Sequence, residues 1–275
     1  MVLMKETCKP LTEEEYAKAF ATFVAGSTEY EEIPKMMKPV IDGLNGRKID
    51  LMSIGAGTGC IEDNLIQQCD LKVKMFLAIE PNIAHRNQLQ ATVASWGEVD
   101  LEIDPSYFDE TYKTEKKFDL ILMSHSMYCV DNPVQIMIKA VSYLKPSGKL
   151  IIFNQTERGG HELYLHLRRN VSMDNRPIND HFVTTKYIAD ALLNNGINFE
   201  LSEAPSTLDV TDFIKQNGSS TANDVVTFFL QTNYEALNDD LKKSIYEMVK
   251  DRCVDDEHGR HMFSHPNGMV FVSAN

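Results

Sequence analysis

A strand that ends in three closely spaced glycines constrains the fold of this chain more than any other feature. The segment DLMSIGAGTGC carries Gly55, Gly57 and Gly59 after an apolar strand and before the helix-forming IEDNLIQQ. Glycine lets the backbone turn tightly and approach a ligand where a Cβ atom would intrude. Glu80 closes the next strand, where a carboxylate accepts hydrogen bonds from ribose hydroxyls. This order predicts a cofactor site in an α/β fold, against the simpler reading of a compact turn followed by a helix cap.

The spacing of the glycines separates two classes of cofactor. Nicotinamide and flavin folds favour G-x-G-x-x-G, and here the third glycine comes one residue early. The motif therefore favours S-adenosylmethionine over a dinucleotide. Tyr112 and Lys116 form the Y-x-x-x-K pair of one dehydrogenase family, but they lie in the charged run ETYKTEKKFD, which favours a solvated surface segment. A nicotinamide-dependent oxidoreductase stays open as the lesser alternative.

Short apolar runs recur through the first half of the chain with helix-length segments between them. This alternation is typical of a mostly parallel sheet with helices on both faces. The predicted strands lie at 49–54, 74–79, 99–103, 118–124 and 148–154.

The rest of the chain has a different rhythm. A helix is predicted at 11–24, where Thr12 and Glu15 form a capping box. Beyond residue 155 come a break at Gly159 and Gly160 and a series of further elements. These are helices at 185–195, 222–233 and 239–252 and strands at 197–201 and 268–274. With no repeat or linker, we expect one domain over 1–275, with a helical cover at 1–48, a cofactor core at 49–155 and acceptor-binding insertions with the C-terminal strands at 156–275.

Charge and cysteine content exclude several classes of protein. The net charge of −13 has the wrong sign for attracting a nucleic acid backbone. Five scattered cysteines without a C-x-x-C pair indicate reduced thiols rather than disulfides or a zinc site. No segment has the length of a signal peptide or a membrane span. We expect a cytoplasmic protein with no nucleic acid or membrane partner.

Segments spread over nearly the whole chain resemble class I S-adenosylmethionine-dependent methyltransferases, in particular the histamine N-methyltransferase family. The glycine motif is common to all methyltransferases, whereas GSTEY, MYxV and STLDVTDFI are more specific. The resemblance implies a Rossmann-like, doubly wound α/β fold whose mostly parallel seven-stranded sheet has an antiparallel C-terminal strand. It implies an N-methyltransferase with S-adenosyl-L-methionine as cofactor and a small histamine-like or histidine-like imidazole or amine as acceptor. We expect the protein to be a monomer.

The resemblance also assigns cofactor-binding residues. It places the three glycines beside the methionine moiety and Glu80 on the ribose. The remaining cofactor positions match His85, where the family has a glutamine, Ser106 and Tyr107 by the adenine, and Ser124 at the end of the fourth strand.

The acceptor site carries two departures from the family. The substrate glutamate matches Glu29 and an aromatic wall residue matches Tyr128, but a substrate glutamine falls on His125 and a substrate asparagine on His265. The methyl group of a sulfonium is already electrophilic, so the protein mainly aligns a lone pair with it. Glu29 would neutralise an ammonium, and His125, His265 or water would serve as the weak base. The simpler reading of Glu29 is a helix-cap contact.

Some of the histidines could also be metal ligands, so we consider a metal site. His161 and His166 are five residues apart, so they do not share one ligand face of a helix. His161 lies in a segment that the family uses around the acceptor, where it could converge with His125 and His265, but we expect no metal. A methyltransferase-fold protein that binds or senses without catalysis remains the alternative of a different class.

Overall fold

The computed structural model describes residues 6–44, 46–127, 130–173, 183–218 and 223–274. The chain divides into two compact units, each with a hydrophobic core. The sheet unit consists of Tyr30–Gln155, Ile178–Ala204 and Asn267–Asn275, and the helix-rich unit of Met1–Glu29, Thr156–Pro177 and Pro205–Pro266. The predicted helical cover is thus divided at Glu29, and the predicted C-terminal part contributes to both units. That the chain acts as one domain stays a prediction.

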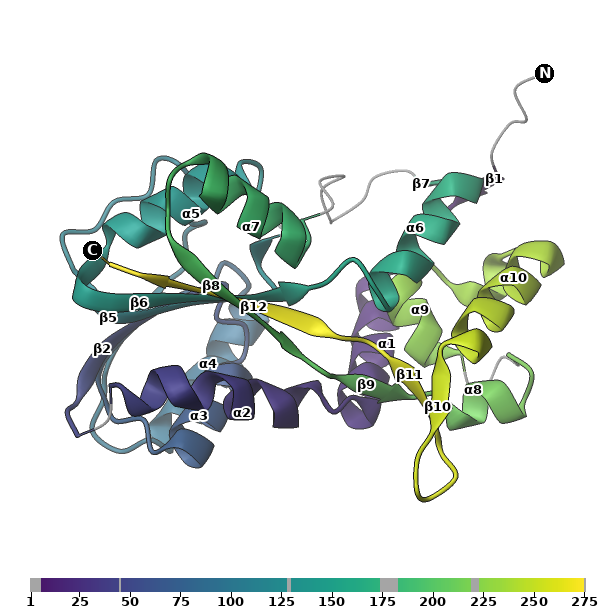
Figure 1. Cartoon of the computed structure of the whole chain (residues 1–275), viewed down its shortest axis with the longest axis horizontal. Coiled ribbons are helices and arrows are strands. Elements are labelled where there is room, and N and C mark those ends of the chain that lie inside the picture. The colour runs from purple at the N-terminus through teal and green to yellow at the C-terminus, as the bar shows by residue number, and fades with distance from the viewer. Residues whose placement is uncertain (1–5, 45, 128–129, 174–182, 219–222, 275) are drawn as a thin grey trace. The chain divides into compact units, whose positions relative to one another are not determined.

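A seven-stranded sheet is the centre of the sheet unit (Figure 1). Its order is β4-β3-β2-β5-β6-β12-β8. The first five strands run parallel, and β12 runs antiparallel to both β6 and β8. The bounds are β2 Ile49–Ile54, β3 Val73–Ile79, β4 Asp100–Asp104, β5 Phe118–Ser124, β6 Leu144–Gln155, β8 Phe199–Ala204 and β12 Asn267–Ser273. The predicted fold class and antiparallel C-terminal strand are confirmed.

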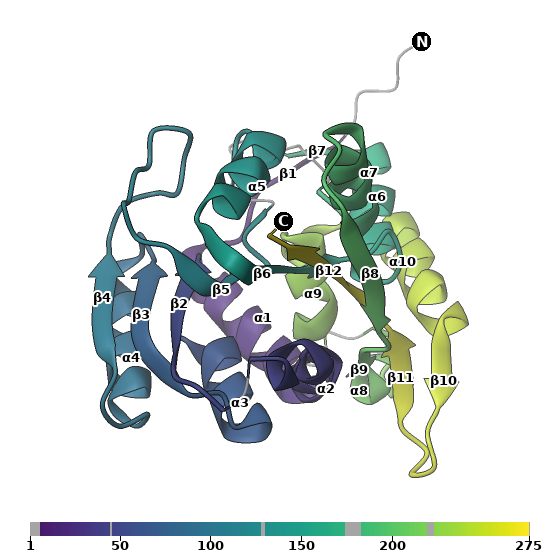
Figure 2. The same ribbon diagram turned by 60° about the vertical axis from the view of Figure 1, so that its left-hand side comes forward.

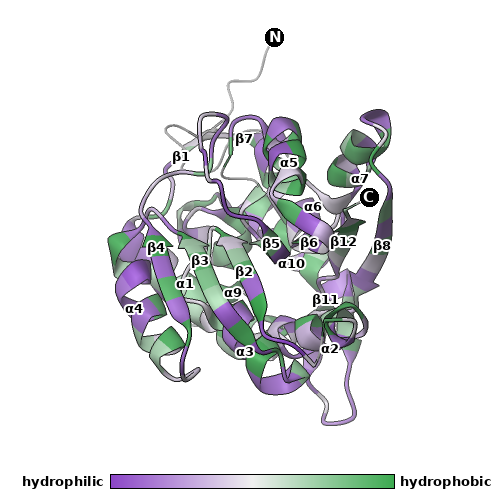
Figure 3. Cartoon of the chain, turned by 90° about the vertical axis from the view of Figure 1, so that its left-hand side faces the viewer, coloured by the Kyte–Doolittle hydropathy of each residue, from purple (hydrophilic) through white to green (hydrophobic). Residues whose placement is uncertain are grey.

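Helices cover both faces of this sheet (Figure 2), because its central strands are apolar on both sides. One core lies under α2 (Glu29–Asp42), α3 (Cys60–Cys69) and α4 (Ile83–Ala94), and the other under α5 (Pro133–Ser142) and α7 (Thr185–Asn194). Figure 3 shows hydrophobic residues along the central strands and both colours on α3 and α4, as amphipathic helices require. The expected solvated segment around Lys116 is exposed, but the expectation is wrong for Tyr112, whose ring is buried in the second core with its centroid 5.0 Å from that of Phe108.

The helix-rich unit is built around a separate core in which α1 packs on α9 and α6 packs on α9 and α10. Its helices are α1 (Glu13–Gly26), α6 (Gly160–Asn170), α8 (Thr211–Lys215), α9 (Asp224–Leu230) and α10 (Asp239–Asp251), with a 3-10 turn η2 at Tyr234–Ala236. Two small sheets complete it, β1-β7 and β10-β11-β9. Their strands are β1 Glu6–Cys8, β7 Val171–Met173, β9 Thr207–Asp209, β10 Cys253–Asp255 and β11 His261–Ser264.

The capping box predicted for the first helix is present. Thr12 Oγ1 accepts from the backbone N–H of Glu15, and a carboxylate oxygen of Glu15 accepts from the N–H of Thr12. Within the described part of the chain, no helix has the length and apolarity needed to cross a membrane.

Candidate cofactor and acceptor sites

The glycine-rich turn lies at the point where the order of the parallel strands reverses. From β2 the chain continues outward to β3 and β4, and then returns to β5 on the other side of β2. Ligands of doubly wound folds bind beyond the carboxyl ends of the strands at this point. Gly55 follows the end of β2, and Ser124 and His125 mark the end of β5. The geometry therefore gathers the predicted cofactor residues at the expected edge of the sheet.

All three glycines have positive φ, but their surroundings differ. A Cβ on Gly55 (φ +72°) would lie 2.7 Å from Cβ of Ser126, and one on Gly59 (φ +77°) would lie 2.6 Å from Cδ1 of Leu89 on α4. A Cβ on Gly57 (φ +55°) would meet no atom of the described residues within 4 Å. Gly55 and Gly59 thus allow close packing within the unit, whereas Gly57 leaves its backbone open to a ligand.

Glu80 connects the next strand to this turn. Its Oε2 accepts the N–H of Gly57 at 2.8 Å, and its Oε1 accepts the N–H of Asn82 at 2.8 Å. Burial raises the pKa of Glu80, but hydrogen bonds from His85, Asn82 and Gly57 outweigh burial and hold the pKa below its ordinary value. Because each carboxylate oxygen has a second lone pair, an ionised Glu80 still has capacity for hydroxyl donors.

The other predicted cofactor residues occupy different surroundings. Nδ1 of the half-exposed His85 lies 3.6 Å from Oε1 of Glu80, and this partner raises the pKa of His85. The hydroxyl of Ser106, in the exposed loop after β4, donates to Asp104 at 2.5 Å, and Tyr107 is 74% exposed. Ser124 is half-buried at the end of β5. The structure therefore brings His85 to Glu80, while Ser106 already bonds within its own loop.

Three polar side chains beside the turn were not predicted from the sequence. Ser53 on β2 donates to Oε1 of Glu62 at 2.6 Å, and both side chains are buried. Burial raises the pKa of Glu62, whose Oε2 is buried with no hydrogen-bond partner among the described residues. The buried hydroxyl of Ser126, next to Gly55, has no protein partner within the described ranges. The open backbone of Gly57, the buried carboxyl of Glu62 and the hydroxyl of Ser126 fit a nucleoside cofactor that carries hydroxyl and amino acid groups.

The predicted acceptor residues Glu29 and His265 meet in the helix-rich unit. Oε2 of Glu29 lies 3.8 Å from Nε2 of His265, and the two residues are 1% and 4% exposed. Glu29 is the first residue of α2, and its N–H donates to the hydroxyl of Ser27. Its carboxylate therefore contacts a histidine 236 positions away in the chain, which the simpler reading of a local cap does not explain.

The other predicted acceptor histidines, His161 and His125, belong to different units. His161 is buried on α6 of the helix-rich unit, and burial lowers its pKa despite the nearby Glu157 and Glu162. His125 belongs to the sheet unit and has a φ of +48°, a conformation that costs energy in most residues and often marks functional positions. Tyr128 lies outside the described residues. The histidines do not form a metal site among the residues described: no group of three suitable ligands occurs there.

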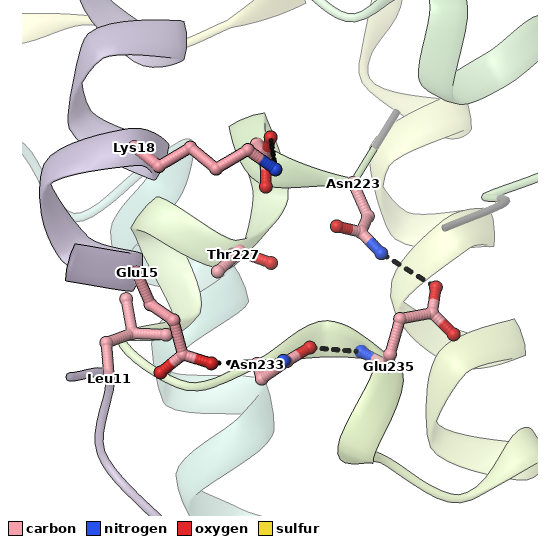
Figure 4. Close-up of a pocket in the computed structure, with 8 residues that line it drawn as sticks. Leu11, Glu15, Lys18, Asn223, Thr227, Asn233 and Glu235 are labelled. Carbon is pink, nitrogen blue, oxygen red and sulfur yellow. Dashed lines mark hydrogen bonds and ion pairs between the residues drawn. The ribbon is translucent and has the colours of Figure 1, made fainter. Parts of the chain in front are cut away.

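A surface pocket of about 270 Å³ in the helix-rich unit involves none of the predicted site residues (Figure 4). Its polar groups mostly bond one another: Lys18 pairs with Asp224, and Asn223 donates to Glu235 at 2.7 Å. We therefore assign it no ligand. It is lined by Leu11, Glu15, Lys18, Asn223, Asp224, Thr227, Asn233 and Glu235.

Solved structures with the same fold include YcgJ protein from Bacillus subtilis and the plantazolicin methyltransferase BamL in complex with S-adenosylhomocysteine. YcgJ is 9% identical with a TM-score of 0.56, and the alignment covers 89% of this chain and 99% of YcgJ. BamL is 13% identical with a TM-score of 0.52, over 95% and 91% of the two chains. At these identities the similarity establishes the fold.

Curated relatives match almost the full chain. Carnosine N-methyltransferase 2 from Gallus gallus is 27% identical, over 97% of this chain and 88% of the relative. Histamine N-methyltransferase A from Xenopus laevis is 23% identical, over 94% and 95%. The methyltransferase domain family matches residues 30–202, more than half of the chain. The predicted S-adenosylmethionine cofactor is thereby confirmed, and the chain belongs to the methyltransferase domain family.

Proposed function

We propose that this enzyme transfers a methyl group from S-adenosylmethionine to a nitrogen of a small acceptor that carries an imidazole or a cationic amine. The observation that carries the proposal is the buried carboxylate of Glu29 in contact with His265. Partners that compensate for lost hydration stabilise a buried carboxylate, and a cationic acceptor would add to the partners that Glu29 has within the protein. The names of the relatives, carnosine and histamine N-methyltransferases, support an acceptor of this class.

In the sheet unit, the chain's own groups bind and orient the cofactor. The bound cofactor supplies an electrophilic methyl group on a sulfonium. Glu80 would accept hydrogen bonds from the ribose hydroxyls while it keeps the N–H bonds of Gly57 and Asn82. Gly57 presents backbone without a side chain, and the hydroxyl of Ser126 would find a partner in the ligand.

On the acceptor side, the chain needs only to hold a nitrogen lone pair in line and keep water away. Glu29 would bind the acceptor's cationic group, with no covalent nucleophile involved. The methylated nitrogen then carries a positive charge and releases a proton if it bears one. His125 or a water would take that proton, because a nitrogen or oxygen lone pair can accept it.

A half-buried arginine supports the proposal that the acceptor also carries a carboxylate. Arg168 follows His161 by seven residues, so both project from the same side of α6, while the neighbouring Arg169 is exposed. Arginine is suited to carboxylates because its planar fork donates two parallel hydrogen bonds. Carnosine and histidine contain an imidazole and a carboxylate, whereas histamine lacks the carboxylate. We therefore propose that histamine is not the preferred acceptor.

Steady-state kinetics with matched arginine variants test this choice. Arg168→Gln should raise the KM for carnosine or histidine by roughly tenfold, the size of one charged hydrogen bond, and leave the KM for histamine nearly unchanged. Arg169→Gln is the control and should change neither. Equal effects of Arg168→Gln on all three acceptors would contradict the assignment of a carboxylate.

A thermal-shift measurement separates the enzyme class from the alternatives. S-adenosylhomocysteine should raise the Tm and NADH should not, because only a ligand of the folded state stabilises it. Stabilisation by NADH instead would favour an oxidoreductase. Stabilisation by S-adenosylhomocysteine without turnover of any acceptor would favour a binding or sensing protein.

A further inference from the structure

The backbone of the helix-rich unit holds the side chain of His265 in one orientation. The N–H of His265 donates to the carbonyl of Ser206 at 2.9 Å, which anchors the residue after β11. The N–H of Gly160, at the start of α6, points at Nδ1 of the imidazole at 3.4 Å. The rings of Phe23 and Phe229 flank the imidazole, with centroids 5.7 and 4.6 Å from its own. The position of the ring is thus fixed by backbone and aromatic contacts.

The bond from Gly160 also decides where the proton of His265 lies. A backbone N–H only donates, so Nδ1 must present a lone pair to accept it. A neutral imidazole then carries its proton on Nε2. Nε2 is the atom that lies 3.8 Å from Oε2 of Glu29. In this tautomer the N–H of His265 faces a buried carboxylate.

The sequence indicates Gly159 and Gly160 only as a boundary between secondary-structure elements, but both glycines are required for this arrangement. Gly159 has a φ of +69°, and a Cβ there would lie 2.9 Å from both Cα of His265 and the carbonyl oxygen of Ser264. A Cβ on Gly160 would lie 2.1 Å from the ring of Phe229. Real Cβ atoms do not approach other atoms so closely, so only glycines allow the start of α6 to reach the imidazole.

We propose that His265 is a positioning residue that acts through Glu29: fixed from behind by the N–H of Gly160, it directs its Nε2–H at the carboxylate and orients Glu29 for the acceptor's cationic group. The inference rests on the proposed function, in which Glu29 binds that group. His265, which stands where the family has an asparagine, thus contributes to acceptor affinity rather than to proton transfer. A donor without charge suits this role because it leaves the negative charge of Glu29 for the acceptor.

Kinetics of three variants with histamine and carnosine as probes test the role. His265→Leu removes the donor and should raise the acceptor KM roughly threefold, at the weak end of a neutral hydrogen bond because Nε2 lies 3.8 Å from the carboxylate, with little change in kcat. His265→Asn keeps an N–H donor and should restore most of the affinity. His166→Asn is the control, because His166 lies on the same helix but bonds Ser244. A large loss of kcat with unchanged KM in His265→Leu would overturn the proposal.

A double-mutant cycle shows whether His265 acts through Glu29. In a Glu29→Gln background, His265→Leu should cost much less kcat/KM than in the wild-type protein. Equal costs in the two backgrounds would overturn the proposal.

A nitrogen NMR spectrum of the wild-type protein tests the same inference without any acceptor, and does so even if His265→Leu fails to fold. We expect His265 as the neutral Nε2–H tautomer at neutral pH. A proton on Nδ1, or a doubly protonated ring, would overturn the inference. If the spectrum shows the expected tautomer but neither histamine nor carnosine is methylated, the proposed acceptor class fails while the inferred geometry stands.

Discussion

Removal of the Glu80 carboxylate is the perturbation whose consequence follows most directly from the structure. Glu80 accepts two backbone N–H groups at 2.8 Å, one of them from Gly57 in the glycine-rich turn. In the complex it would also accept the two ribose hydroxyls. Glu80→Ala therefore removes hydrogen bonds to the ligand and a support of the turn together, whereas Glu80→Gln keeps the size and one acceptor oxygen.

The magnitude can be worked from these bonds. Hydrogen bonds to a charged group contribute about 1.5–3 kcal/mol each, and every 1.4 kcal/mol is about a factor of ten in affinity. Loss of even one ribose bond in Glu80→Ala thus predicts at least tenfold weaker binding. Glu80→Gln should give a smaller loss, because its amide oxygen still accepts one hydroxyl. Release of the Gly57 N–H adds to the effect of the alanine variant.

Calorimetric titration with S-adenosylhomocysteine measures these changes without any acceptor. Glu102→Gln is the matched control, because Glu102 is a carboxylate on the neighbouring strand β4 that pairs with Lys116 at the surface. It should leave the Kd unchanged. An unchanged Kd in Glu80→Ala, with the variant folded, would refute the assignment of Glu80 to the ribose.

Three further predictions concern the acceptor residues and the pKa of His85. Glu29→Gln should raise the acceptor KM by about tenfold or more while the Kd for S-adenosylhomocysteine stays the same; equal losses for both ligands would instead indicate a folding role. The double variant His125→Gln with His265→Asn should shift the kcat/KM ratio toward histamine relative to histidine, and a wild-type enzyme that already prefers histamine contradicts this. Because Glu80 raises the pKa of His85, an NMR titration of Glu80→Gln should find the pKa of His85 lowered, and an unmoved pKa would exclude the contact. The stability that this pair adds should be complete below the pKa of His85 in the unfolded chain and should decline as the pH rises through its pKa in the folded protein.

Local sequence patterns predicted the cofactor edge of the sheet well. The bounds of β2 and β5 match the predicted segments residue for residue, because both are mostly apolar runs with clear breaks. The link between Gly57 and Glu80 follows from the topology of adjacent parallel strands, which the motif implies. The capping box at Thr12 was equally accessible, since its two partners are three residues apart.

Contacts between distant segments could not be predicted in the same way. The bond from Gly160 to His265 joins positions 105 residues apart, so the glycine pair reads only as a break in the sequence. The buried pair of Ser53 and Glu62 was missed because a glutamate in the first turn of a helix is normally solvated. The β10–β11 hairpin was also missed, because strands of three and four residues give too short an alternation signal and pair mainly through tertiary context.

Transfer of a labelled methyl group is the most direct test of the central claim. The purified protein is incubated with S-adenosylmethionine labelled in its methyl group and, in turn, with histamine, histidine, carnosine and other biogenic amines, and the products are identified by mass. We expect a labelled N-methyl product, formed most efficiently from an imidazole acceptor that carries a carboxylate. In Glu29→Gln this product should be lost at acceptor concentrations below the KM. An absence of labelled product from every amine and imidazole, in a protein that binds S-adenosylhomocysteine, would contradict it.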